Sequence, residues 1–243
     1  MFRKALLRSM ATTVAVGTAF AGAALAAPAT VAPSIANMSC KAQYQHSVVT
    51  KTHLSLSRTA GEFGQRNVAE VVVTSDAGVP TGRVRITTNL RSWTVTLDPN
   101  GYARHRLSRF LSPGTYPVSA RYYPGCSRFG RSHSPRWSYT VSKAHTSVVD
   151  MHARNIDRGA RPAVGLDVTT STGVTPHGRV RIKLYHHSHL RRARTVRLHG
   201  GHGWVRFGRV WQRRSWQVTA TYLGTRNLRR SASDTGFWVS RRG

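Results

Sequence analysis

Paired arginines are the side chains in this sequence best suited to bind a charged partner. They occur in two nearly identical segments, PTGRVRI at Pro80–Ile86 and PHGRVRI at Pro176–Ile182. Successive side chains of a β-strand point to opposite faces, so both arginines of each segment would share one face and the valine between them would face the other. Guanidinium groups form strong charge-assisted hydrogen bonds with phosphate and carboxylate oxygens. The spacing indicates either a basic surface for a polyanion or one structural strand that occurs twice.

Further basic residues repeat this period, and we expect neighbouring strands to build basic sheet faces that hold a polyanion without reading a sequence. The predicted polyanion-binding residues are Arg83, Arg85, Arg104, Arg106, Arg121, Arg179, Arg181, Lys183, Arg191, Arg192 and Arg194. The alternative is an ordinary solvated face, enriched in arginine by the codon usage of a GC-rich genome. Codon usage explains arginine in place of lysine, but it does not explain the scarcity of aspartate and glutamate.

A group of histidines provides a second candidate site. His186, His187 and His189 lie close together, and His199 and His202 follow. If His187 and His189 occupy one strand, they share a face and could bind a transition metal. If Tyr185 and Arg194 flank a hairpin, His199 and His202 approach the same end of the sheet. The favoured alternative is a solvated cationic loop at His186–Arg194, since metal ligands usually need a second shell of carboxylates or carbonyls and acids are scarce here.

Signatures of catalysis are absent from the sequence. Its eight acids include no close pair that could serve as general acid and base. The G-x-S-x-G, H-E-x-x-H, Walker and EF-hand patterns are also missing. We therefore predict a protein that is not an enzyme and needs no cofactor.

The N-terminal segment and the net charge of the chain both indicate an exported protein. Arg3, Lys4 and Arg8 precede a short apolar run that ends in Ala24, Leu25 and Ala26, the layout of a signal peptide at residues 1–26; an uncleaved anchor is the alternative. Cleavage would leave 34 bases against eight acids, a net charge of +26, on a chain with no later apolar run long enough to span a membrane. A surface so basic attracts polyanions. We expect a secreted or cell-envelope location.

Two cysteines, Cys40 and Cys126, predict one disulfide in an exported chain. It would tie an N-terminal arm, residues 27–44, to the following domain. Reduced or intermolecular cysteines are the alternative.

An internal repeat of about 98 residues organises the rest of the chain. Gly82–Ile86 aligns with Gly178–Ile182, and Thr115–Tyr122 aligns with Ser215–Tyr222, while Gly101–Leu107 matches Gly203–Phe207 loosely. This period suits two tandem domains, predicted at residues 45–142 and 143–243.

Each repeat alternates apolar and polar residues, as strands with one buried face do. The apolar positions include Tyr116, Val118, Ala120 and Tyr122 in the first repeat and Trp216, Val218, Ala220 and Tyr222 in the second. These aromatics are interpreted as core residues, whereas Trp137 and Trp211, near arginines, could instead stack on bases or sugars. About seven short strands per repeat, with no amphipathic helix, predict an all-β fold of two tandem antiparallel sandwiches.

The first repeat resembles the bacterial Ig-like domains of secreted and surface proteins. The resemblance rests on T-x-T-x-L-S-L-S at Thr50–Ser57 and on P-T-G-x-V-x-I, L-D-x-N-G-x-A and G-T-Y-x-V-x-A-x-Y between Pro80 and Ser132. The second repeat keeps only part of this pattern, and Cys126 and Thr225 stand where the family usually has an acidic or small polar residue. The resemblance implies Ig-like sandwiches with a noncatalytic spacer, adhesion or binding role. The high positive charge departs from the family.

Together these features predict an exported adhesion or structural module. Its expected partner is an anionic envelope polymer, such as a teichoic acid, or another polyanion, including nucleic acid bound nonspecifically. The alternatives are a spacer without a ligand and a histidine-dependent metal protein.

Overall fold

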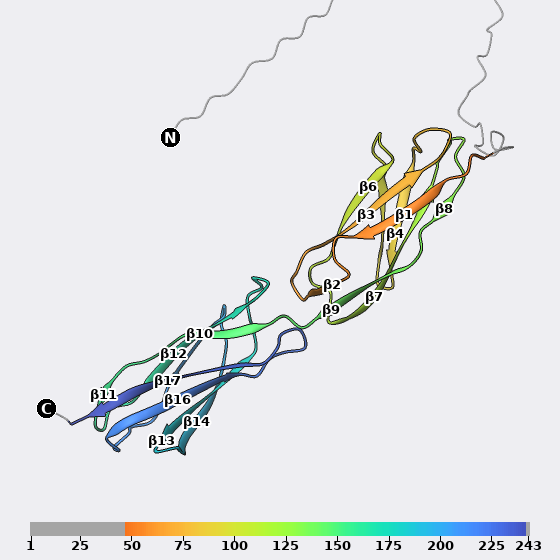
Figure 1. Ribbon diagram of the computed structural model, residues 1–243. Helices are drawn as coiled ribbons and strands as arrows, with labels where there is room; N and C mark the ends of the chain where they lie inside the picture. Colours follow the sequence, from red (N-terminus) through yellow and green to blue (C-terminus); the bar gives the residue numbers. More distant parts are fainter. Residues whose placement is uncertain (1–46, 242–243) are drawn as a thin grey trace, which may run out of the picture. The chain divides into compact units, whose positions relative to one another are not determined.

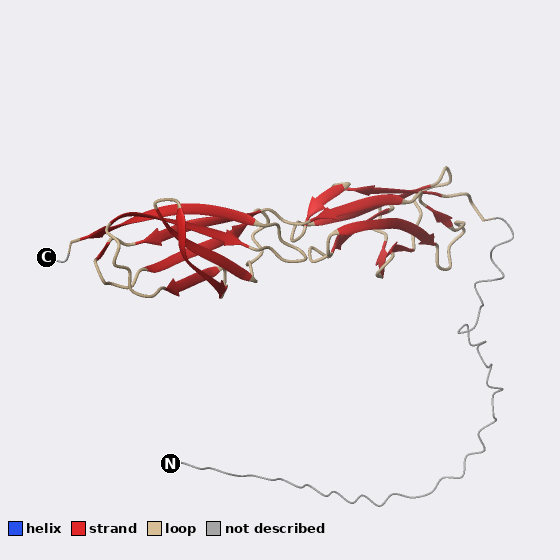
Figure 2. Ribbon diagram, turned by 90° about the horizontal axis from the view of Figure 1, so that it is seen from below, coloured by secondary structure: helices blue, strands red, loops and turns tan. Residues whose placement is uncertain are grey.

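The computed structural model describes residues 47–241, which contain seventeen strands and no helix (Figures 1 and 2). The described residues therefore include no helical segment that could span a membrane. The predicted signal peptide and Cys40 lie outside the described residues, so cleavage after Ala26 and the Cys40–Cys126 disulfide remain predictions.

The strands follow one another with short connections. In chain order they are β1 (Lys51–Leu56), β2 (Ala60–Glu62), β3 (Asn67–Thr74), β4 (Arg83–Thr88), β5 (Ser92–Thr96), β6 (Tyr102–Leu107), β7 (Gly114–Tyr123), β8 (Ser132–His133), β9 (Trp137–Ser142), β10 (Thr146–Ala153), β11 (Ile156–Asp157), β12 (Ala163–Thr170), β13 (Arg179–His186), β14 (His189–Arg197), β15 (His202–Arg206), β16 (Arg214–Tyr222) and β17 (Ser231–Ser240).

The same strand order occurs twice. Strands β1–β9 form a three-stranded sheet, β1-β3-β6, and a six-stranded sheet, β2-β9-β7-β4-β5, in which β8 also pairs with β7. Strands β10–β17 form a three-stranded sheet, β10-β12-β15, and a five-stranded sheet, β11-β17-β16-β13-β14. The predicted all-β class is confirmed. The sheets are not wholly antiparallel, because the short strands β2 and β11 pair in parallel with β9 and β17 at the sheet edges.

One alignment of the two repeats differs from the prediction. The amide of Val73 donates to the Gly101 carbonyl, and the amide of Val168 donates to the Gly201 carbonyl, each at 2.9 Å. Gly101 therefore corresponds to Gly201, two residues before the glycine that the sequence alignment chose. The sequence lacks a strong signal here because the Asp98–Gly101 turn of the first repeat is replaced by a different turn at His199–Gly201.

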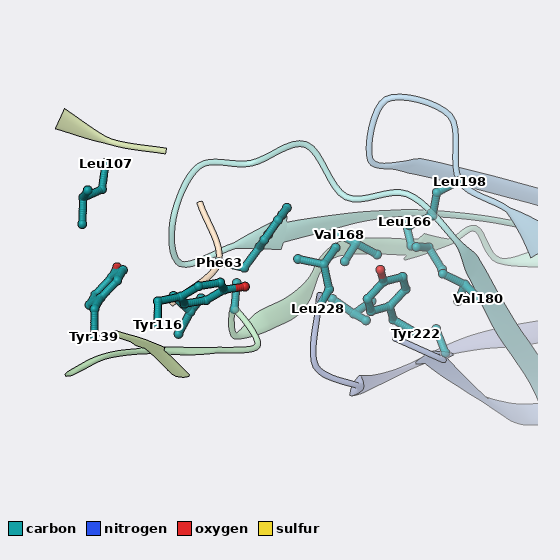
Figure 3. Packing of buried hydrophobic residues seen from close by; sticks show 14 of the residues in the cluster. Phe63, Leu107, Tyr116, Tyr139, Leu166, Val168, Val180, Leu198, Tyr222 and Leu228 are labelled. Atoms are coloured by element: carbon teal, nitrogen blue, oxygen red, sulfur yellow. The ribbon is translucent and has the colours of Figure 1, made fainter. Parts of the chain in front are cut away.

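Buried and exposed residues alternate along these strands, and the buried residues form an apolar core between the sheets, as predicted. Val84, Ile86, Val180 and Ile182 are fully buried, while the arginines that alternate with them are exposed. Figure 3 shows Tyr222 among Leu166, Val168, Val180 and Leu228.

Two of the buried tyrosines, Tyr122 and Tyr222, hold the turns that precede the arginine-bearing strands. The Tyr122 hydroxyl donates to the carbonyl of Thr81 at 2.5 Å, and the Tyr222 hydroxyl donates to that of His177 at 2.6 Å. Both acceptors belong to the residue before the turn glycine. Because the contact uses a backbone carbonyl, the residue itself is free to be threonine in one repeat and histidine in the other.

Replacement of Tyr222 by phenylalanine is expected to lower the free energy of unfolding by about 1 kcal/mol at neutral pH, because the His177 carbonyl loses its donor. Burial raises the pKa of the Tyr222 phenol. The stability that the neutral phenol contributes is therefore fully present below the ordinary phenol pKa, near pH 10. It is lost as the pH rises through the raised pKa of the folded state. Urea unfolding from pH 8 to 11 should show a smaller alkaline loss in Tyr222→Phe than in the unchanged protein. An equal loss would contradict the assignment.

Candidate functional site: basic sheet faces

The first basic face lies on the outside of the six-stranded sheet. Arg83 and Arg85 on β4 are exposed, and Arg85 lies directly opposite Arg121 on β7. The buried partners on the other face are Val84, opposite Tyr122, and Ile86, opposite Ala120. Arg85 also donates through Nη2 to Ser92 Oγ at 2.9 Å. These three arginines form the surface that the sequence predicted for this strand.

Arg104 and Arg106 do not join that face. They lie on β6, which belongs to the three-stranded sheet, where Arg104 Nε is 3.6 Å from Glu70 Oε1 on β3. The prediction placed all five arginines of the first repeat on neighbouring strands of one sheet. It was wrong because adjacency along the chain does not decide which of two sheets a strand enters.

The second basic face lies on the outside of the five-stranded sheet. Arg179, Arg181 and Lys183 alternate along β13 with the buried residues Val180, Ile182 and Leu184. Arg197 on β14 lies directly opposite Arg179, and so belongs to the same face although it was not among the predicted binding residues. We refer to Arg179, Arg181, Lys183 and Arg197 as the β13–β14 basic face.

Three predicted residues of β14 lie elsewhere. Arg192 and Arg194 are opposite Leu184 and Ile182, so they lie on the same face of the sheet as those buried residues and not on the basic face. Both arginines are nevertheless exposed, because β14 is an edge strand. Arg192 Nη2 donates to the carbonyl of Arg209 at 3.1 Å. Arg191 falls in a register shift of the hairpin and has no partner in β13. A bulge moves side chains between faces, which a strict period of two in the sequence does not reveal.

Few acids neutralise these faces. In residues 47–241, the only arginine–carboxylate ion pair is that of Arg104 with Glu70. Asp234 on β17 shares the outer face of the five-stranded sheet, but β16 separates it from Lys183, about 10 Å away at the usual strand spacing. The like charges of Arg179 and Arg197, and of Arg85 and Arg121, therefore stand opposite each other, and none of these four arginines forms an ion pair with a carboxylate of the described residues.

The predicted metal-binding pair is not assembled as proposed. His186 and His189 are register partners, so His187 and Ser188 form the hairpin turn between β13 and β14, both with positive φ. His187 and His189 therefore do not share a strand, and the predicted loop His186–Arg194 is mostly strand. No group of three or more histidine, cysteine, aspartate or glutamate side chains suited to a metal ion exists within residues 47–241.

His199 and His202 lie at the other end of β14 from that turn. His202 Nδ1 is 2.6 Å from Asp167 Oδ1, and both residues line an open hollow of about 550 Å³ together with His152 and Trp204. The full length of the strand separates this hollow from His187, so the five histidines do not meet.

The aromatic residues are buried or exposed as the sequence indicated. Trp216, Tyr116, Tyr122 and Tyr222 are buried. Trp137 and Trp211 are exposed, as are Trp204 and Trp238.

Comparison with known proteins identifies the family of the first repeat. Residues 54–142 match the family described as bacterial Ig-like domain (group 3), which confirms the resemblance drawn from the sequence. No curated protein sequence matches the chain.

Solved structures with similar folds are distant. A 1.5-MDa bacterial ice-binding adhesin has a TM-score of 0.35 at 15% identity, with 81% of this chain and 66% of that chain covered. Fibronectin(III)-like modules of CbhA from Clostridium thermocellum have a TM-score of 0.30 at 14% identity, covering 78% of this chain and 94% of that chain. The Yersinia pseudotuberculosis adhesin InvE has a TM-score of 0.33 at 14% identity, covering 76% and 58%. Residues 54–142 thus define a bacterial Ig-like domain, and the distant structures add no argument about what it binds.

Proposed function

We propose that this protein is an exported, noncatalytic module for adhesion or structure in the cell envelope or outside the cell, and that it holds anionic polymers on its basic sheet faces. Each of the two pairs of sheets would be one Ig-like domain, at residues 45–142 and 143–243. The observation that carries the proposal is the β13–β14 basic face, whose four cations have no ion-paired acid in the described part of the chain.

The physical basis of the proposed binding is electrostatic repulsion between basic side chains that form no ion pair with an acid. Like charges directly opposite each other on neighbouring strands destabilise a sheet, and Arg179 and Arg197 are such a pair. A polymer with regularly spaced phosphates relieves this repulsion and releases the counterions that both surfaces otherwise retain. Guanidinium groups on a rigid sheet bind phosphates without ordering a loop, so the face would hold many polyanions and distinguish them poorly. Anionic envelope polymers and nucleic acid both fit this description.

Binding is expected to weaken steeply with salt. For duplex DNA used as a model polyanion, the logarithm of the affinity should fall with the logarithm of salt concentration by about 0.9 for each phosphate contact. Replacing Arg179, Arg181 and Arg197 together by alanine should reduce that slope by up to about 3 units. Fluorescence anisotropy between 50 and 300 mM NaCl measures both.

The matched control removes the same charge from another surface. Arg154, Arg158 and Arg161 are exposed and lie outside the basic faces. Their joint replacement by alanine should change the slope less than the Arg179, Arg181 and Arg197 variant does. Equal losses in the two variants would assign binding to net charge alone. Binding that survives high salt would overturn the electrostatic mechanism. Absence of binding to any polyanion would leave the module as a spacer without this ligand.

A further inference from the structure

A hollow of about 580 Å³ lies beside the β13–β14 turn and is lined by cations. Its walls come from that turn, from the start of β16 and from the end of β17. The lining residues are His186, His187, Arg213, Arg214, Trp238, Val239, Ser240 and Arg241. None is acidic. The proposed polyanion-binding faces do not include this hollow.

His186 supplies the polar atom that lacks a partner. Its side chain is buried, with a relative exposure of 7%, between the Trp216 ring, 5.0 Å away between centroids, and the His187 ring, 4.3 Å away. Its Nε2 lies 2.9 Å from the carbonyl of Arg213. A carbonyl only accepts, so Nε2 carries a hydrogen and, in the neutral imidazole, Nδ1 is an acceptor. Nδ1 is buried and has no hydrogen-bond partner within residues 47–241.

The charges around His186 Nδ1 favour one kind of hydrogen-bond partner for it. A buried polar atom without a hydrogen-bond partner is unfavourable, and a ligand that pairs with it removes that cost. The charged and titratable groups around the imidazole are His187 and His189 at the turn, Arg213 and Arg214 at β16, and Arg241 after β17. Asp157 on β11 accepts a hydrogen bond from the Ser240 hydroxyl at 2.8 Å, and its single negative charge is outnumbered by the three arginines of the lining. Positive charge so arranged favours an anion, and an anion accepts a hydrogen from Nδ1 only after Nδ1 has gained a proton.

Arg214 supports the interpretation of this hollow as a built site. Its φ is +84°, a left-handed conformation that is unfavourable for a residue with a side chain. It follows directly on the residue whose carbonyl holds His186. Backbone strain of this kind persists where the surrounding structure enforces it, often at ligand sites.

We propose that this hollow binds a phosphate group and that His186 takes up a proton as it binds. The proposal rests on the proposed polyanion function and adds to it a phosphate contact outside the basic faces. Arg213, Arg214 and Arg241 would neutralise the phosphate, His186 Nδ1 would donate to one oxygen, and the exposed Trp238 would contact the molecule that carries the phosphate. The source is either free phosphate or a phosphate within a polymer.

The test compares tripolyphosphate affinity at pH 6 and pH 8 by calorimetry in phosphate-free buffer at constant salt. Coupling to one proton changes an affinity by at most about tenfold per pH unit, and we expect binding about tenfold tighter at pH 6. His186→Phe keeps a ring against Trp216 and should reduce this ratio by at least about fivefold. His53→Phe removes an exposed histidine of β1 and should leave the ratio unchanged.

A second measurement does not depend on how the variant folds. At pH 7.5, ¹⁵N NMR of the unchanged protein should show His186 Nδ1 becoming protonated as phosphate is added. Inorganic phosphate and tripolyphosphate are titrated separately: protonation by both indicates a site for free phosphate, and protonation by tripolyphosphate alone indicates a site for a polymer. If salt-sensitive binding persists while Nδ1 stays unprotonated, or if His186→Phe and His53→Phe show the same pH ratio, the inference is overturned and the proposed function stands. Absence of binding at either pH overturns both.

Discussion

Trp216→Ala is expected to lower the free energy of unfolding by about 3–5 kcal/mol, the range for removing a large aromatic side chain from a core. The side chain has a relative exposure of 1%, and its ring stacks on Phe237 at 6.0 Å and 14°. The indole Nε1 donates to the carbonyl of Gln212 at 3.1 Å. Alanine leaves a cavity beside Phe237 on the middle strand of the five-stranded sheet, and it leaves the Gln212 carbonyl without its donor.

Trp204→Ala is the matched control for this effect. Trp204 lies on β15 with a relative exposure of 63%, so its loss should change stability by no more than about 0.5 kcal/mol. Both variants are measured by urea unfolding followed by circular dichroism, because tryptophan fluorescence differs between them. Similar losses for the two would show that burial does not govern the role of Trp216.

Gly82→Ala is expected to cost about 2–4 kcal/mol, the combined effect of a strained backbone and a steric overlap. Gly82 has φ of +135°, a conformation open to glycine and unfavourable for other residues. A Cβ atom there would lie 2.5 Å from the carbonyl oxygen of Tyr123 and 3.0 Å from Pro124, both backbone positions. The same turn positions the Thr81 carbonyl that accepts from Tyr122, so its displacement would disturb the core as well.

The control separates backbone strain from the overlap. Gly173 also has a positive φ, +69°, but a Cβ atom there would meet nothing within 4 Å. Gly173→Ala should therefore cost only about 1 kcal/mol, the ordinary penalty of the left-handed conformation. Urea unfolding of the two variants gives the difference directly, and equal costs would contradict the predicted overlap at Gly82.

The basic residues illustrate where sequence reasoning succeeds. Arg83, Arg85, Arg179 and Arg181 were predicted to point to solvent, and they do, because alternation along a strand is a local property. Arg104 was placed on the wrong sheet, since sheet membership depends on strand pairing far along the chain.

The histidines show the complementary limit. The sequence grouped them by spacing, but a two-residue turn at His187 and Ser188 and the bulge that follows decide which faces they occupy. The partnerless Nδ1 of His186 has no sequence signal at all, because it arises from the position of the Arg213 carbonyl and the packing of Trp216.

By itself, the sequence of this protein determined the all-β class, the core positions, the Ig-like family of the first repeat and the role of PTGRVRI and PHGRVRI as equivalent strands. These follow from local periodicity and from repetition. Only the tertiary structure decided that Arg197 lies beside Arg179 on one face and that Arg192 and Arg194 lie on the opposite face. It also decided that His186 borders a cationic hollow. Those outcomes depend on strand pairing and register, which are set by contacts between residues distant in the chain.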